Sequence, residues 1–383
     1  MTKHYTDEGT LLIRNSDIKD GKFEFGDNPI YLEKTFAEKN ETRMHQIGDV
    51  ITVHTGDVGT SAVITENEAK SIGFATIVTR PNPKIIDSNY LCSFLNTDKH
   101  KKWAVSISTG DGRTNYNLGD YFELVVPVPS IAEQKRIASY IQKLNRLITL
   151  HQRKYDKLTN VKKSMLGKMF PQNGSNVPEI RFKGFTEAWE QRKFDEVFDC
   201  TIPNNTLSRA ELNYESGSVR NIHYGDILIK YGSVVDVQND EIPFATGKSS
   251  DDFKGALLRD GDIIIADTAE DETTGKACEI GNSQGLDVVS GLHTMVCRPR
   301  NKMALGYLGY YLNSDAYHHQ LLPLMQGIKV LSLSRTNVQK TMVCYPKSKA
   351  EQQLIADCFR NLDNLITLHQ RKPNFYTGGY YAE

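Results

Sequence analysis

The stretch "AEQKRIASYIQKLNRLITLHQRK" at residues 132–154 recurs without a gap as "AEQQLIADCFRNLDNLITLHQRK" at residues 350–372. Fourteen of the 23 aligned positions are identical, and the final "LITLHQRK" is identical throughout. A match of this length between two parts of one chain indicates an internal duplication, and two long copies do not make a solenoid of short repeats. The chain is therefore built from two copies of one unit.

The repeated stretch has the periodicity of a long helix. Apolar positions recur in alternating steps of four and three residues, which predicts a heptad seam. Ser130 is the expected N-cap with Glu133 as its capping-box partner, and Pro171 ends the helix. About 40 residues of helix would be roughly 60 Å long and would need a partner for the seam. The seam positions are Ile137, Ile141, Leu144, Ile148, Tyr155 and Leu158 in the first copy and Ile355, Phe359, Leu362 and Ile366 in the second.

The regions upstream of the two helices also agree with each other. "IGDVITVHTGD" (47–57) matches "DGDIIIADTAE" (260–270) in outline, and "NYLCSFLNT" (89–97) matches "GYLGYYLNS" (306–314). Short β-branched runs such as "DVITVHT", "FATIVTR", "GDILIKYG" and "HTMVCRP" predict strands, and the stretches 87–106 and 301–322 predict helices. The mixture lacks a regular βαβ order, so we expect an α+β fold with two mixed α/β blocks separated by long helices. The helices should pair as an antiparallel coiled coil with pseudo-twofold symmetry.

Composition limits the kind of protein. The 383 residues suffice for more than one domain, and no apolar run reaches the length of about 20 residues that spans a bilayer. The six cysteines form no C-x-x-C pair, which favours a cytoplasmic protein with reduced thiols. The net charge is −1, but residues 131–170 hold 10 basic and 2 acidic residues. A basic stretch of this kind is typical either of a solvated helix face or of a surface for nucleic acid or an acidic partner.

No catalytic or metal-binding motif stands out. The chain lacks G-x-S-x-G, H-E-x-x-H and G-x-G-x-x-G, and "ATGKS" (245–249) lacks the first glycine of a phosphate-binding loop. His318 and His319 are adjacent, which is not a metal-ligand spacing, and the acidic run "DTAEDE" (267–272) is typical of a solvated loop. We therefore expect no catalytic residue, no metal and no cofactor on this chain.

The central region resembles the specificity subunits of type I restriction-modification systems. The resemblance rests on Glu133-Gln134, the two copies of "LITLHQRK", "KMFP" (168–171), "PEIRF" (178–182), "AWEQRKF" (188–194) and Glu351-Gln352. It covers essentially the whole chain, is specific in the helices and is loose in the globular blocks. It implies a first target-recognition domain at 1–128, a spacer helix at 129–171, a linker at 172–186, a second target-recognition domain at 187–346, a distal helix at 347–372 and an atypical tail at 373–383.

The resemblance also implies a function. Each recognition domain would read half of a bipartite target in double-stranded DNA, and the helices would dock two methyltransferase subunits through the seam. S-adenosylmethionine, ATP and Mg would then be bound by the methyltransferase and by a motor-endonuclease subunit, because the specificity subunit is not an enzyme. Two features depart from the family pattern. The first block has no counterpart of "FTEAWEQRKFDEVF" (185–198), so we expect it to be incomplete at its N-terminus, and Pro373 truncates the second helix.

Base readout needs hydrogen-bonding side chains on exposed loops. We single out polar residues that follow predicted strands or lie in loops such as "GDGRTNYN" (110–117), although each is also an ordinary surface residue. The candidates are Arg14, Asn15, His54, Thr55, Arg113, Asn115 and Asn117 in the first block and Lys230, Tyr231, Thr268, Lys329 and Arg335 in the second. Three alternatives remain open: a coiled-coil scaffold without a DNA role, an enzyme with its own activity, and a silent or truncated specificity cassette.

Overall fold

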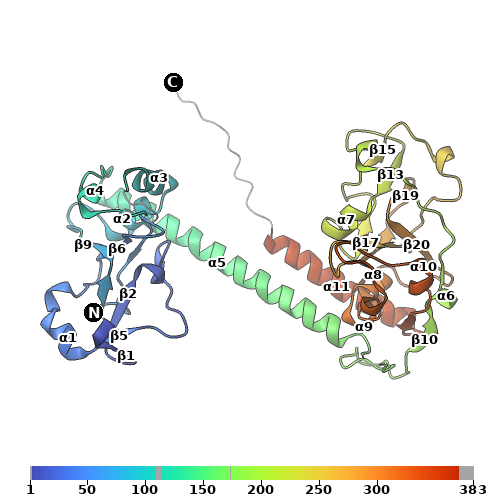
Figure 1. Ribbon diagram of the computed structural model, residues 1–383, viewed down its shortest axis with the longest axis horizontal. Helices are drawn as coiled ribbons and strands as arrows, with labels where there is room; N and C mark the ends of the chain where they lie inside the picture. The colour runs from blue at the N-terminus through green and yellow to red at the C-terminus, as the bar shows by residue number, and fades with distance from the viewer. Residues whose placement is uncertain (1, 109–113, 173, 371–383) are drawn as a thin grey trace. The chain divides into compact units, whose positions relative to one another are not determined.

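The computed structural model describes residues 2–108, 114–172 and 174–370 (Figure 1). The chain divides into two compact units, Met1–Leu150 and His151–Glu383, and the division falls inside the long helix α5 (Ile131–Lys168). The 38 residues of α5 agree with the predicted helix, and Pro171 follows its end as expected. None of the described helices is both long and apolar enough to cross a membrane.

The first unit contains a four-stranded sheet, a three-stranded sheet and the two-stranded pair β3-β4. The four-stranded sheet has the order β1-β5-β2-β8, in which β2 and β8 are parallel, and the three-stranded sheet has the antiparallel order β7-β6-β9. The strands are β1 (Tyr5–Thr6), β2 (Thr10–Arg14), β3 (Ile18–Lys19), β4 (Lys22–Phe23), β5 (Tyr31–Leu32), β6 (Val50–Val53), β7 (Ser61–Val63), β8 (Ile72–Phe74) and β9 (Thr76–Thr79). The helices besides α5 are α1 (Lys34–Lys39), α2 (Ser88–Leu95), α3 (Asp98–Ile107) and α4 (Leu118–Phe122).

The second unit repeats the four-stranded and the three-stranded sheet, adds β11 and β14 at the edges of the latter, and has two further two-stranded sheets, β10-β22 and β17-β21. The order β12-β15-β13-β19, with β13 parallel to β19, matches β1-β5-β2-β8, and β20-β16-β18 matches β9-β6-β7. The strands are β10 (Glu190–Lys193), β11 (Phe198–Asp199), β12 (Leu212–Asn213), β13 (Val219–Ile222), β14 (Val234–Asp236), β15 (Phe244–Ala245), β16 (Ile263–Ala266), β17 (Thr268–Ala269), β18 (Ala277–Gly281), β19 (Asp287–Ser290), β20 (Thr294–Pro299), β21 (Leu331–Ser332) and β22 (Met342–Tyr345). The helices are α6 (Phe194–Val197), α7 (Tyr224–Ile229), α8 (Tyr307–Leu312), α9 (Asp315–His318), α10 (Arg335–Val338) and α11 (Lys349–Gln370).

Two ion pairs at equivalent positions show how closely the units correspond. Arg80 forms a bidentate pair with Asp49, with both N–O distances 2.8 Å. In the second unit Arg298 binds Asp262 in the same way, at 2.8 and 2.7 Å. Both carboxylates are buried and sit just before the central strand, β6 or β16, so each arginine ties the strand to its neighbour β9 or β20. The duplication inferred from the sequence is thus confirmed in the globular blocks.

A repeated glutamine fixes each helix to its own unit. Gln134 Nε2 donates to the carbonyls of Ile85 and Pro129, and its Oε1 accepts from the amide of Asp87. Gln352 is likewise buried: its Oε1 accepts from the amide of Ala304, and its Nε2 donates to a proline carbonyl, that of Pro346. A buried amide that satisfies backbone groups on both sides holds the elements in one geometry. This explains why the glutamine is repeated at the start of both helices.

Within the second unit α11 packs antiparallel against the last part of α5. His151 contacts His369 with the Nδ1 atoms 2.9 Å apart, Lys162 pairs with Asp363, and Phe170 stacks on Phe359 with ring centroids 5.7 Å apart. Residue numbers rise along α5 while they fall along α11, which confirms the predicted antiparallel pairing. The pseudo-twofold arrangement of the two blocks stays a prediction.

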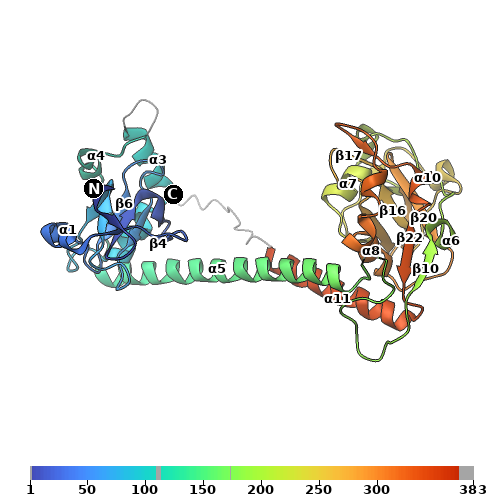
Figure 2. The same ribbon diagram turned by 60° about the horizontal axis from the view of Figure 1, so that its bottom comes forward.

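Along α11 the predicted seam makes two kinds of contact. Ile355 and Phe359 are buried in a core shared with α8 of the recognition block. Later residues of α11, Asp363 and His369, contact α5, which runs beside α11 (Figure 2). In the first unit the start of α5 buries Gln134 and Ala138, whereas Ile137 is 36% exposed. The predicted seam combined two different contacts because both need apolar residues at heptad spacing.

The predicted strand "GDILIKYG" is wrong, because residues 224–229 form helix α7. The His223 ring caps this helix by accepting a hydrogen bond at Nδ1 from the amide of Gly225, at 3.2 Å. A short apolar run fits a helix or a strand equally well, and here Ile227 is buried whereas Ile229 is 89% exposed. The helix predicted over 87–106 is also divided in two, because the Thr97 side chain caps a new helix, α3.

Candidate nucleic-acid interface

Four of the predicted readers in the first unit form one hydrogen-bonded network. Asn15 follows β2, and its Oδ1 accepts from the amide of His54, which follows β6, at 3.3 Å. His54 Nδ1 lies 2.7 Å from Thr55 Oγ1, and Thr55 Oγ1 donates to Asn115 Oδ1 at 2.9 Å. Residues separated by up to 100 positions in the sequence are thereby brought together where two strands end.

The network has a rigid base. The amide of the fully buried Tyr116 donates to the carbonyl of His54, and the Tyr116 hydroxyl contacts Nε2 of the buried His100 at 3.3 Å. Thr55 and Asn115 also form an isolated antiparallel bridge. Burial raises the pKa of Tyr116 far above its usual value, so the phenol stays neutral. A fixed backbone of this kind holds polar side chains in defined positions, as readout of base edges requires.

Three other predicted residues of the first unit are placed differently. Arg14 is half-buried and bound to Asp17 through Nε and Nη2, at 3.0 and 2.8 Å, and this contact raises the pKa of its guanidinium. Its charge is therefore already neutralised locally. Asn117 caps α4 in a capping box with Asp120. Arg113 lies outside the described residues.

The second unit has a polar cluster at the equivalent position. Thr268 follows β16 as Thr55 follows β6, and it pairs with Ser332 across β17 and β21 as Thr55 pairs with Asn115. Thr268 Oγ1 donates to Asp267 Oδ1 at 2.8 Å and lies 3.5 Å from His293 Nδ1. The scaffold is thus the same, while most of the side chains on it differ.

Three members of this second cluster were not among the residues predicted from the sequence. His223 follows β13 as Asn15 follows β2, Tyr224 comes next, and His293 contacts the Tyr224 ring edge-on at 5.2 Å. The signal was available, because His223 follows a strand at a position that aligns with Asn15. His293 lies in the turn between β19 and β20 with a positive φ of 54°, which no sequence pattern indicated.

The two histidines that face these clusters present opposite hydrogen-bonding functions. Burial, and secondarily Arg209, lowers the pKa of His223, so its ring is neutral near pH 7. Because His223 Nδ1 accepts from Gly225, its ring proton is on Nε2, which is then a donor. Thr55 donates its hydrogen to Asn115, so in the contact with His54 the Thr55 oxygen accepts and His54 Nδ1 donates. Donor and acceptor positions are what distinguish base pairs in the major groove.

The remaining predicted residues of the second unit divide into exposed and buried ones. Lys329 and Arg335 are exposed, and Lys329 lies next to Ile328, which is 100% exposed. Lys230 pairs with Glu241 at 2.6 Å and lies over the Tyr214 ring. Tyr231 is 4% exposed and belongs to a hydrophobic core, so its ring is a packing residue in this structure, which does not support a base contact.

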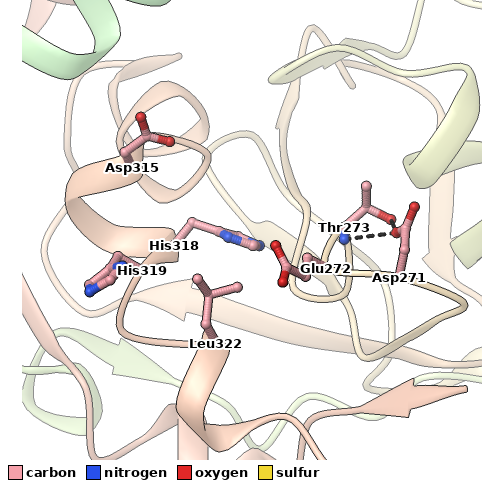
Figure 3. A pocket seen from close by; sticks show the side chains of 7 residues that line it. All are labelled: Asp271, Glu272, Thr273, Asp315, His318, His319 and Leu322. Atoms are coloured by element: carbon pink, nitrogen blue, oxygen red, sulfur yellow. Dashed lines mark hydrogen bonds between the residues drawn. The ribbon is translucent and has the colours of Figure 1, made fainter. Parts of the chain in front are cut away.

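A separate pocket in the second unit is lined by Asp271 and Glu272, the end of the acidic run, and by the adjacent histidines His318 and His319 (Figure 3). His318 extends from α9 towards Glu272, and its Nε2 contacts the carbonyl of Thr274 at 3.0 Å. Asp271 accepts from the amide and hydroxyl of Thr273 in a local turn. No group of three His, Cys, Asp or Glu side chains suited to a metal ion occurs in the described ranges. The acidic lining would repel phosphate, so this pocket is not part of the candidate interface.

Comparisons with known proteins agree with this arrangement. The model of the type I restriction modification DNA specificity domain matches residues 4–160 and 186–375. The MjaVIII specificity subunit of Methanocaldococcus jannaschii is 22% identical over 299 residues, which are 76% of this chain and 66% of that protein. The EcoBI specificity subunit of Escherichia coli is 26% identical over 137 residues, 36% of this chain and 29% of that protein. The chain thus spans less than two thirds of these relatives.

A solved structure shares the fold. The type I restriction-modification system S subunit from M. genitalium superposes with a TM-score of 0.51 and 13% identity, covering 96% of this chain and 86% of that one. The family model matches far more than half of the sequence, once in each unit. The chain belongs to the family of type I restriction modification DNA specificity domains.

Proposed function

We propose that this chain recognises a bipartite target in double-stranded DNA, with one half-site read by each unit. The supporting observation is that two units of the same fold carry different hydrogen-bonding side chains at the same strand-end position. The repeated strands place the two clusters at equivalent positions, and the differing side chains of the clusters would select different bases. The half-sites should be separated by roughly one turn of B-DNA, about 34 Å.

Affinity for the DNA backbone would come from outside the polar clusters. The exposed Lys329 and Arg335 flank β21, whose Ser332 pairs with Thr268 of the second cluster. Helix α5 contributes all ten basic residues of 131–170. Contacts to phosphates supply much of the affinity and little of the specificity. Because both recognition units are mildly acidic, we expect strong binding only when partner subunits add further basic surface.

The same proposal assigns the helices to partner docking. Helix α5 exposes an apolar surface of a kind that proteins normally cover. Its members, each at least half exposed, are Tyr140 (66%), Leu147 (52%), Ile148 (62%) and Leu150 (50%). The occupants would be two methyltransferase subunits that bind S-adenosylmethionine, joined by motor-endonuclease subunits that use ATP and Mg. The chain itself would take no catalytic part, and we propose no cofactor on it.

Co-expression with the type I methyltransferase subunit from the same genome, followed by mapping of methylated adenines, tests the proposal. We expect a stable complex and one new split motif that requires this chain. A complex that methylates no defined motif would support the alternative of a scaffold without DNA recognition. Absence of any complex would contradict the docking assignment and favour a silent cassette.

A further inference from the structure

A loop beside the second polar cluster ends in an exposed apolar tip. Ile328 is 100% exposed, the highest value among the large hydrophobic side chains that the structure describes, and Val330 is 51% exposed. Gly327 begins the tip with a φ of 128°, and a Cβ there would collide with the carbonyl oxygen of Val330. The tip, residues 327–330, is therefore a tight turn whose apolar side chains face outwards.

The stem of this loop is anchored to the polar cluster. The backbones of Gln326 and Ser332 exchange two hydrogen bonds, at 3.0 and 2.8 Å. Ser332 in turn pairs with Thr268 across β17 and β21. The amide of the buried Leu333 donates to the carbonyl of Asp267 at 2.8 Å. The tip is thus held next to side chains that we propose as base readers.

The first unit indicates that the repeated scaffold does not require an apolar tip. The bridge at Asn115 corresponds to the pair at Ser332, so "TGDGR" (109–113) is the sequence counterpart of "QGIKV" (326–330). The second position is glycine in both stretches, but the third is aspartate in the first unit and isoleucine in the second. The isoleucine is therefore a property of one recognition unit, as a residue that contacts one half-site would be.

The charge around the tip suits a polyanion. Residues 316–350 contain five lysines or arginines and no aspartate or glutamate. Lys329 is exposed within the tip, and Arg335 is exposed beyond β21. Apolar side chains accompanied by cations are what proteins that kink DNA insert between base pairs, because the cations bind the flanking phosphates. The cations favour nucleic acid over an apolar protein surface as the partner of this tip.

We propose that the tip enters a groove of the half-site read by the second unit and places Ile328 between two adjacent base pairs, as a wedge that unstacks them. This inference rests on the proposed DNA recognition and deepens it. Because pyrimidine–purine steps unstack most easily, the wedge favours such a step at its position. The second unit then reads the deformability of the DNA at a place where it makes no hydrogen bond to a base.

Mismatched DNA provides the probe, because a mismatch lowers the cost of unstacking. Two fluorescein-labelled duplexes of one mixed sequence, with and without a central T·T mismatch, are titrated with the full chain at low salt, where phosphate contacts are strongest. Fluorescence anisotropy should show that the parent chain binds the mismatched duplex at least about tenfold more tightly. Ile328→Ala should bind both duplexes equally, and its affinity for the paired duplex should change by less than about twofold, because phosphate contacts supply that binding.

Two control variants distinguish the wedge from other contributions. Ile180→Ala removes the same kind of side chain from the linker, where Ile180 is 43% exposed, and should keep the preference for the mismatch. Lys329→Ala should weaken binding to both duplexes by the same factor and also keep the preference, because a phosphate contact does not depend on stacking. Ile328 is fully exposed, so its truncation should leave the fold intact.

The outcomes separate this inference from the proposed function. Equal binding of the two duplexes by the parent chain, or a preference that Ile328→Ala retains, would overturn the wedge and leave DNA recognition in place. Absence of binding to either duplex would contradict the proposed function and the wedge together. If the parent shows no preference and Ile328→Ala instead prevents co-purification with the methyltransferase subunit, the tip contacts a protein and the wedge is wrong.

Discussion

Glu351→Ala should strongly destabilise the second unit. The substitution removes both hydrogen bonds to Arg181, whose side chain is only 13% exposed, and the contact to Trp189. Breaking a buried ion pair by removing one partner costs about 3–5 kcal/mol, because the remaining charge loses its compensation. Arg181 keeps some access to water, so we expect the lower end, about 3 kcal/mol.

Glu133→Ala is the matched control within the same chain. It removes the same kind of side chain at the same position of the repeated helix, but the carboxylate of Glu133 is exposed. Surface substitutions away from specific contacts change stability by about 0.5 kcal/mol or less. Comparison of the two variants therefore distinguishes the contribution of the ion pair from any general effect of removing a glutamate near a helix N-terminus.

Tryptophan fluorescence allows the second unit to be followed alone. Trp189 lies at the substituted site, and Trp103→Phe removes the signal of the first unit. For an m value of about 3 kcal/mol per molar urea, a loss of about 3 kcal/mol lowers the unfolding midpoint by about 1 M. Equal midpoints for Glu351→Ala and the parent, or equal losses for Glu351→Ala and Glu133→Ala, would refute the reasoning.

Three further predictions concern stability. The side chains of Asn96 and Asn313 each bind both the amide and the carbonyl of one strand residue, Ser61 and Ala277 respectively. Asn96→Ala and Asn313→Ala should therefore each lower the free energy of unfolding by about 1–3 kcal/mol in urea unfolding. A loss of stability from only one of the two substitutions would contradict their equivalence. Burial raises the pKa of Glu279 from 4.5 to about 7, so its carboxyl holds a proton more tightly in the folded state than in the unfolded state. The folded state therefore loses about 3 kcal/mol of stability as pH rises between these two values. Glu279→Gln should therefore raise the melting temperature at pH 8 and leave it nearly unchanged at pH 4.5; no gain at pH 8 would contradict this. Burial lowers the pKa of His45 from 6.5 to about 4, so the first unit should lose stability as pH falls through this range. His45→Gln should make the stability of the first unit less dependent on pH, as measured by Trp103 fluorescence.

The duplication, the long helices and most of the central strands could be predicted from the sequence, because these features depend on local periodicity. It also placed Asn15, His54, Thr55 and Asn115 among the candidate readers, His54 and Thr55 because they follow a predicted strand and Asn115 because it lies in a polar loop. That these four share a single hydrogen-bond network could not be deduced, because it depends on the register between β2, β6 and residues 114–116.

The failures have physical causes too. The apolar run in α7 was ambiguous between helix and strand, and its cap, His223, is an uncommon capping residue. Tyr231 follows this run and looked exposed only under the strand assignment. The heptad pattern did not separate the two kinds of contact along α11, because a helix stripe does not tell whether another helix or a recognition block covers it.

Recognition of one half-site by each unit is tested by mapping methylated motifs for the complex with the methyltransferase. Two variants are compared with the parent chain: the double variant Thr55→Ala/Asn115→Ala and, separately, Thr268→Ala. We expect the double variant to alter or relax bases in one half-site only, and Thr268→Ala to affect only the other half-site. A continuous motif, or changes in both halves from either variant, would show that the two units do not read separate half-sites.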